Sequence, residues 1–236
     1  MACEDLIDES RPYSLCDRCI RDMEWIRGRT CRCGKALNPE WKWDLCSDCM
    51  EGGRVFDRGI ACTVYNGRAK EVIRGMKYRD RPWHGRHIAD IMADRLTAES
   101  DRDTGEMISY DYIIPVPMHG RKERRRGYNQ AALIGKALAD NLSMDFAEGV
   151  LIRKRPTSVM SGLGRSERVF NLEGAFAVKA GCEEMLNGAS LLLVDDVYTT
   201  GSTADACARA LFDAGASKVD VMVFAAGANY AAKHGA

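Results

Sequence analysis

The chain has 236 residues, of which 34 are basic, 34 are acidic and 46% are hydrophobic, so its formal net charge is zero. This balance excludes a global field that would attract nucleic acids or membranes, and any such binding must come from local patches. No apolar run approaches the roughly 20 residues needed to cross a bilayer, and the acidic N-terminus lacks the apolar segment of a secretory signal. We therefore expect a cytoplasmic protein with one substantial core and a small appendage.

The first 57 residues are predicted to form a small cysteine-rich domain. The chain has ten cysteines, and in this region they form the close pairs Cys16-x-x-Cys19, Cys31-x-Cys33 and Cys46-x-x-Cys49. In a cytoplasmic chain such pairs indicate metal binding rather than disulfides. Two pairs supply the four thiolates that a tetrahedral zinc ion requires. We therefore predict a zinc-ribbon domain over residues 1–57 with a structural zinc ion.

The second and third pairs form the preferred site. Gly34 directly after Cys33 frees backbone N–H groups for the sulfur atoms, and twelve residues separate the two pairs. The predicted ligands are Cys31, Cys33, Cys46 and Cys49. The spacing Cys31-x-Cys33 is one residue shorter than a usual knuckle. Cys16 and Cys19 therefore remain open as substitutes, or as half of a second site with Cys3.

Residues 58–236 are predicted to form a second domain of the α/β class. It begins with a strand over residues 59–65, followed by helical spacing of apolar residues over 69–76 and 88–96. His84 and His87 lie between these helices without a nearby acidic partner, and we expect them to be surface residues. This pattern of a strand followed by helices indicates a sheet with helical cover.

A strand over residues 111–117 ends in Pro115-Val116-Pro117 and leads into a basic run over 121–126. A helix over 131–142 follows. Open α/β sheets bind their ligands at the carboxyl ends of strands, and arginine forks match diphosphate oxygens. We therefore assign Arg126 and part of the basic run to an anionic ligand, with nucleic-acid contact as the second interpretation.

Residues 151–176 are basic, rich in Ser and Gly, and lack periodicity before the short strand at 176–178. A long loop of this kind indicates a lid that closes over a substrate. Thr157 and Arg168 are its candidate ligand-binding members.

The most informative stretch is Leu191 to Thr203, which reads LLLVDDVYTTGST. An apolar strand ends in Asp195 and Asp196, and a loop of small hydroxyl residues then leads into an amphipathic helix. Asp205 is placed to form a capping box with Ser202, and Gly215 marks the expected end of the helix. A last buried strand is predicted over residues 218–227.

This stretch suits a sugar phosphate. Amides at a helix start bind a phosphate dianion, glycine allows close approach, and hydroxyls add donors. The two carboxylates repel phosphate, so we expect them to bind sugar hydroxyls or a divalent cation. The candidate phosphate-binding residues are Thr199, Thr200, Gly201, Ser202 and Thr203, and the candidate catalytic residues are Asp195 and Asp196.

The stretch resembles the phosphoribosyl diphosphate (PRPP) motif of type I phosphoribosyltransferases, in which apolar residues and two acids precede T-T-G-x-T. With the cysteine pairs, Pro115-Val116-Pro117 and Arg126 to Gln130, nearly the whole chain is similar to the ComF family. The resemblance implies a twisted, mainly parallel sheet flanked by helices, of the type I phosphoribosyltransferase-like class, behind a zinc-ribbon domain. It also implies PRPP binding with magnesium and, for several members, a role in DNA uptake during natural transformation. Met160 replaces the glutamine that relatives carry in the lid.

Three hypotheses follow. The first is a phosphoribosyltransferase that acts on an unknown acceptor. The second is a non-catalytic sensor of PRPP or a nucleotide. The third is an adaptor that binds single-stranded DNA, or DNA-uptake proteins, through the zinc ribbon and the basic run.

Overall fold

A five-stranded sheet lies at the centre of the computed structural model, with strand order β1-β7-β6-β2-β3 and every neighbouring pair parallel. The structure describes residues 12–78, 81–99, 108–155, 172 and 174–228. The predicted lid residues Thr157 and Arg168, as well as Met160 and Cys3, lie outside the described residues. The strands are β1 (Arg58–Val64), β2 (Tyr112–Pro115), β3 (Asp145–Phe146), β6 (Ser190–Tyr198) and β7 (Lys218–Ala226).

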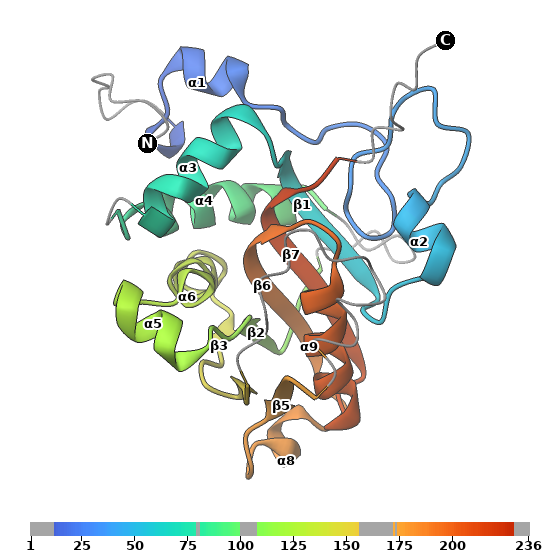
Figure 1. Ribbon diagram of the computed structural model, residues 1–236, viewed down its shortest axis with the longest axis vertical. Coiled ribbons are helices and arrows are strands. Elements are labelled where there is room, and N and C mark those ends of the chain that lie inside the picture. Colours follow the sequence, from blue (N-terminus) through green and yellow to red (C-terminus); the bar gives the residue numbers. More distant parts are fainter. Residues whose placement is uncertain (1–11, 79–80, 100–107, 156–171, 173, 229–236) are drawn as a thin grey trace.

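Helices cover both faces of the sheet (Figure 1). One face carries α3 (Gly67–Tyr78), α4 (His84–Thr97) and α6 (Gln130–Leu142), and the other carries α9 (Ser202–Asp213). Strand β6 is apolar along its first half because both faces are covered: Leu191 and Leu193 pack in the core beneath α9, and Leu192 packs in the core beneath α4 and α6. The predicted mainly parallel sheet flanked by helices is therefore confirmed.

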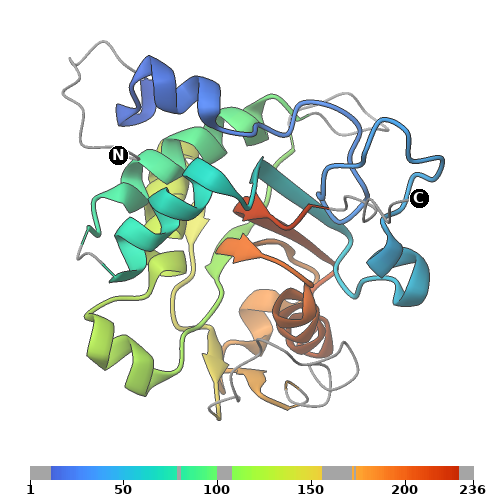
Figure 2. The same ribbon diagram turned by 45° about the horizontal axis from the view of Figure 1, so that its top comes forward.

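The cysteine-rich region lies against the edge of β1 (Figure 2). Its elements are η1 (Pro12–Ser14), α1 (Asp17–Asp22) and α2 (Ser47–Gly52). Between α1 and α2, Trp25 bridges Thr63 in antiparallel fashion, and Ile26 N donates to Cys62 O at 2.9 Å. The region is thus joined to the sheet by backbone hydrogen bonds.

Two predicted segments differ in the structure. The basic run forms a separate helix, α5 (Gly120–Arg126), which ends at Gly127 because that residue adopts a left-handed φ of 89°. The segment predicted as a loop from residue 151 begins with strand β4 (Leu151–Arg153), which pairs antiparallel with β5 (Phe176–Val178). A short helix, α8 (Glu183–Leu186), follows β5. Strand β4 was not predicted because three residues are too few to show an alternation of apolar and polar side chains.

The expectation that His84 is a surface residue is wrong. Its side chain is buried, and its Nδ1 lies 3.3 Å from Val72 O of α3. Gly75 provides the room, since a Cβ at that position would lie 2.8 Å from His84 Cε1. Burial lowers the pKa of His84 to about 4, so the imidazole is neutral near pH 7.

The order of the strands defines where a ligand can bind. From β2 the chain continues to β3 on one side of the sheet, whereas from β6 it continues to β7 on the other side. The direction of winding therefore reverses between β2 and β6, which are hydrogen-bonded neighbours. In open α/β sheets the ligand crevice lies outside the carboxyl ends of the strands at such a reversal. Asp195 and Asp196 lie near that end of β6.

Candidate functional site

The loop between β6 and α9 presents an anion-binding helix start. Gly201 occupies the N-cap position with a left-handed φ of 82°. The first helical hydrogen bond runs from Asp205 N to Gly201 O at 2.8 Å, so the amides of residues 202–204 precede it and point out of the helix end. Thr200 Oγ1 lies 3.2 Å from Ser202 Oγ. Amides, hydroxyls and the dipole of a 12-residue helix therefore converge at one point.

A cavity of about 460 Å³ opens at this loop. Its polar lining includes Asp195, the loop residues 199–203 and Lys122 of α5. The structure thus brings Asp195 and all five candidate phosphate-binding residues around one space. The remaining lining residues are Val197, Tyr198, Ala204, Val221 and Val223.

The two neighbouring carboxylates have different surroundings. Successive residues of a strand point to opposite faces, so Asp195 lines the cavity while Asp196 faces α3. There Asp196 Oδ2 lies 2.7 Å from Lys77 Nζ, and Asp196 is only 5% exposed. The backbone N–H of Asp196 donates to Asp195 Oδ1 at 2.8 Å, which fixes the Asp195 carboxyl group at the cavity.

These contacts also shift the pKa values of Asp195 and Lys77. Burial and the adjacent carboxylate of Asp196 hold the pKa of Asp195 well above its ordinary value. Burial opposes the charge of Lys77, but the attraction and hydrogen bond of Asp196 together with the charge of Asp195 outweigh it, and the pKa of Lys77 is raised. One acid of the pair is therefore neutralised by an internal cation, and Asp195 is the acid left to face a ligand.

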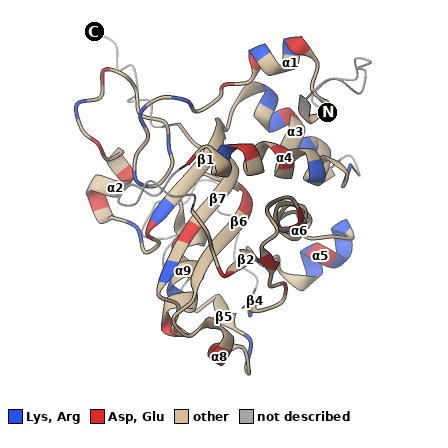
Figure 3. Ribbon diagram, turned by 180° about the vertical axis from the view of Figure 1, so that it is seen from behind, with Lys and Arg blue, Asp and Glu red and all other residues tan. Residues whose placement is uncertain are grey.

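Helix α5 contributes positive charge beside the cavity (Figure 3). Lys122 lines the cavity, whereas the guanidinium of Arg126 donates to Gln130 Oε1 at 2.5 Å and stacks 5.7 Å from the ring centre of Tyr78. Arg126 therefore lies on the helix that borders the cavity but outside its lining. Figure 3 shows basic residues along most of α5, and Arg121, Lys122, Arg124 and Arg125 are exposed.

The expected capping box is wrong. The carboxylate of Asp205 accepts from Val55 N at 2.9 Å and from Arg54 Nη1 at 3.2 Å. The left-handed Gly201 at the N-cap position makes no side-chain cap. The first turn of α9 is therefore tied to the end of the cysteine-rich region.

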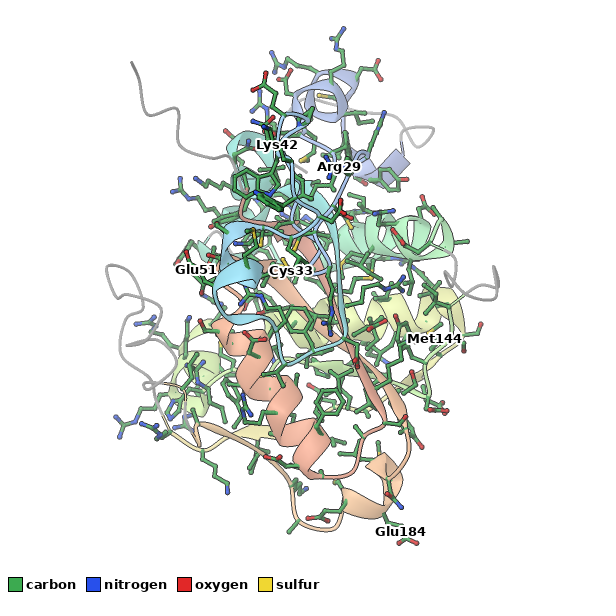
Figure 4. The ribbon with its side chains drawn as sticks, turned by 90° about the vertical axis from the view of Figure 1, so that its right-hand side faces the viewer. Arg29, Cys33, Lys42, Glu51, Met144 and Glu184 are labelled. Carbon is green, nitrogen blue, oxygen red and sulfur yellow. The ribbon has the colours of Figure 1, made fainter. Side chains whose placement is uncertain are left out.

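A four-thiol cluster lies in that region (Figure 4). The sulfur atoms of the cluster lie within 4.8 Å of one another, and all four residues are buried; they are Cys31, Cys33, Cys46 and Cys49. A tetrahedral zinc site with Zn–S bonds of about 2.3 Å places its sulfurs about 3.8 Å apart, and Cys33 Sγ lies 3.6 Å from Cys46 Sγ. The four thiols therefore fit a structural zinc ion, as predicted.

The first cysteine pair lies apart from this cluster. Cys19 is buried in the core beneath α3 and α4, whereas the four clustered cysteines belong to the core beneath α9. The short spacing Cys31-x-Cys33 closes because Gly34 adopts φ 83° and donates its N–H to Cys31 O at 2.8 Å. Hydrogen bonds from the other three thiols hold the pKa of Cys33 well below its ordinary value, and a thiolate is the form that binds metal.

Sequence reasoning did not single out Lys77, Lys122 or Arg54 as individual site residues. Lys77 lies 119 positions from its partner Asp196 in the numbering, so no local pattern joins them. Lys122 belongs to a run in which every residue is basic or acidic, and periodicity does not show which of them faces the sheet. Arg54 lies in a segment that reads as a polar junction.

Curated relatives match most of the chain. Competence protein F of Haemophilus influenzae is 28% identical over 189 residues, which cover 80% of both chains. DNA utilization protein YhgH of Escherichia coli K12 is 30% identical over 212 residues, 89% of this chain and 88% of that protein. The chain belongs to the ComF family. No family model matches the sequence.

A solved structure with a similar course of the chain is the glutamine PRPP amidotransferase of B. subtilis, in complex with ADP and GMP. It is 16% identical, with a TM-score of 0.41, and the match covers 64% of this ComF-family chain and 30% of that chain. No helix in the described parts of the chain has the length and apolar character that crossing a bilayer requires.

Proposed function

We propose that this ComF-family protein binds PRPP with magnesium and transfers its phosphoribosyl group to a nitrogen nucleophile. The observation that carries the proposal is the cavity at the carboxyl end of β6, where Asp195 and the loop of residues 199–203 line one space. An anion-binding helix start beside a carboxyl group matches a ligand that carries both a phosphate monoester and sugar hydroxyls.

The roles divide as follows. The amides and hydroxyls of residues 199–203 hold the 5-phosphate, and Asp195 accepts hydrogen bonds from the ribose hydroxyls. Asp196 orients the site through its ion pair with Lys77. Lys122, with Arg126 behind it on α5, attracts the diphosphate. Carboxylate oxygens are ligands that magnesium prefers, and the ion would offset charge on the diphosphate when bound.

In the proposed transfer the bond between the anomeric carbon and the diphosphate oxygen breaks, and its electron pair leaves with the diphosphate. The lone pair of the acceptor nitrogen forms the new carbon–nitrogen bond, and the nitrogen releases a proton to solvent. Positive charge develops at the anomeric carbon during the step. The carboxyl group of Asp195 beside the ribose is placed to stabilise it.

A link to DNA uptake is part of the proposal. The names of the relatives concern competence and DNA utilization. As a second candidate function, the protein is an adaptor for single-stranded DNA, which is favoured by the exposed residues Arg124 and Arg125 on α5. Salt-sensitive DNA binding that weakens when these two residues are changed to glutamine would favour the adaptor.

The test is ligand-dependent stabilisation of the zinc-loaded protein. PRPP with magnesium at about 100 times its dissociation constant adds about 2.7 kcal/mol, which raises the melting temperature by about 5–10 °C for a chain of this size. We expect Asp195→Asn to abolish the shift and Asp196→Asn to reduce it, whereas Asp140→Asn on the exposed end of α6 leaves it intact. An unchanged melting temperature of the wild-type protein would overturn the proposal.

Catalysis is tested separately by diphosphate release. Release on addition of one member of a panel of nitrogenous bases would support transfer. Stabilisation by PRPP without release across the panel would instead favour the sensor, in which binding is kept and transfer is lost.

A further inference from the structure

A chain of ion pairs runs from the cysteine-rich region to the first turn of α9. Lys35, which follows the pair Cys31 and Cys33, lies 2.6 Å from Asp48, which lies between Cys46 and Cys49. Asp48 lies 3.5 Å from Arg54, and Arg54 lies 3.2 Å from Asp205 of α9. The side chain of Arg54 is only 2% exposed. Because buried ion pairs require well-defined geometry, this chain sets the position of α9 relative to the thiol cluster.

The loop of residues 199–203, here called the phosphate loop, packs directly against Arg54 of these ion pairs. A Cβ on Gly201 would lie 2.6 Å from Cε2 of Tyr198 and 3.1 Å from Cζ of Arg54. Gly201 therefore touches both side chains, and its left-handed conformation brings the loop down onto them. Arg54 and Tyr198 meet the loop at Gly201, and Tyr198 also lines the cavity together with residues 199–203.

Tyr198 connects the loop to the thiol cluster itself. Its ring packs edge-on against Phe56, with ring centres 6.3 Å apart, and Lys35 Nζ lies 5.5 Å from the ring centre. The ring belongs to the same buried core as the four cysteines, and its buried hydroxyl group makes no hydrogen bond within the described residues. A single side chain therefore contacts Gly201 of the loop on one side and the core that holds the four thiols on the other.

We infer that Arg54 and Tyr198 are positioning residues, which hold the phosphate loop in its binding conformation against the metal-bound cysteine-rich region. The inference rests on the proposed function, because it assigns the loop to a phosphate monoester. Phosphate binding requires amides that already point at one place, and a glycine loop with nothing beneath it would lose that orientation. The metal site and the ligand site are thus energetically coupled.

The test uses the full-length protein and ribose 5-phosphate, which carries the monoester without the diphosphate. Its affinity is measured by calorimetry on zinc-loaded wild type, Arg54→Met, Arg54→Lys and Tyr198→Phe. The matched control is Arg29→Met, which removes a 2.8 Å ion pair with Asp44 and the hydrogen bonds to Trp41 O and Trp43 O on the exposed side of the same region. A second readout is the visible spectrum of the cobalt-loaded proteins, which reports on the geometry of the four thiolates.

We expect Arg54→Met to weaken binding of ribose 5-phosphate by about tenfold or more, with partial recovery in Arg54→Lys and no change in Arg29→Met. We also expect the ligand to shift the cobalt bands of the wild type and of Arg29→Met, but not those of Tyr198→Phe. A purely structural role of Arg54 would not make the cobalt spectrum respond to the ligand. If Arg54→Met does not fold, Tyr198→Phe alone carries the test.

The two ideas fail in different ways. Wild-type affinity in Arg54→Met, or a cobalt spectrum that does not respond to saturating ligand, overturns the coupling and leaves the proposed function standing. If wild type binds neither ribose 5-phosphate nor PRPP, the proposed function is overturned and the coupling with it.

Discussion

Replacement of Gly201 by alanine measures how tightly the phosphate loop is seated. The residue adopts φ 82°, where an L side chain costs about 1–2 kcal/mol. The new methyl group would also lie 2.6 Å from the Tyr198 ring, closer than atoms approach in packed cores. Overpacking of this kind costs about 1–3 kcal/mol. We therefore expect Gly201→Ala to lower the free energy of unfolding by about 2–5 kcal/mol in total.

Gly181 provides the matched control. It adopts φ 87°, and a Cβ there would meet no atom within 4 Å, so Gly181→Ala incurs only the backbone term. Urea unfolding of both zinc-loaded variants separates the two terms, and Gly201→Ala is expected to be less stable than Gly181→Ala by about 1–3 kcal/mol. Equal stabilities would show that the loop does not rest on Tyr198 and Arg54, and the reasoning would be refuted.

Three further predictions concern the metal, the acidic pair and the buried histidine. Elemental analysis should find zinc in wild type and in Cys19→Ser but not in Cys33→Ser; loss of zinc in Cys19→Ser would contradict the assigned ligands. Lys77→Met strands the buried carboxylate of Asp196 and should lower the free energy of unfolding by about 3 kcal/mol, with part recovered in the double variant with Asp196→Asn; full stability of the single variant in urea would count against the ion pair. Because folding lowers the pKa of His84 from 6.5 to about 4, the unfolded chain binds the extra proton first as the solution is acidified. The contribution of neutral His84 to the free energy of unfolding is therefore fully present above pH 6.5 and falls by about 3 kcal/mol towards pH 4. Guanidinium unfolding of wild type and His84→Gln across this pH range measures it, and the same pH dependence in both proteins would contradict the prediction.

The parts of the fold that could be predicted are those whose signal is local. The apolar run 191–194 predicted the central strand, and the spacing of Ala204, Cys207 and Leu211 predicted the helix after it. The thiol pairs predicted the metal site because ligand type and spacing together leave few alternatives. Each of these features depends on residues fewer than twenty positions apart.

The parts that could not be predicted depend on contacts between distant segments. Asp205 fits a capping box by its spacing, yet Arg54 and Val55, about 150 positions earlier, take its carboxylate instead. His84 has the sequence context of a surface residue, and only the gap left by Gly75 on another helix explains its burial. Tertiary contacts overrule local preference at both places.

The attachment of the cysteine-rich region to β1 has a consequence for how the protein fails. Residues 24–26 occupy the outer side of β1, whose amides and carbonyls would otherwise be open to any extended chain. The opposite border of the sheet needs no such cover, since β3 is only two residues long. Removal of the metal would therefore expose the backbone N–H and C=O groups along the outer edge of β1. We expect self-association through β1 to follow, seen as turbidity that increases with protein concentration after chelation.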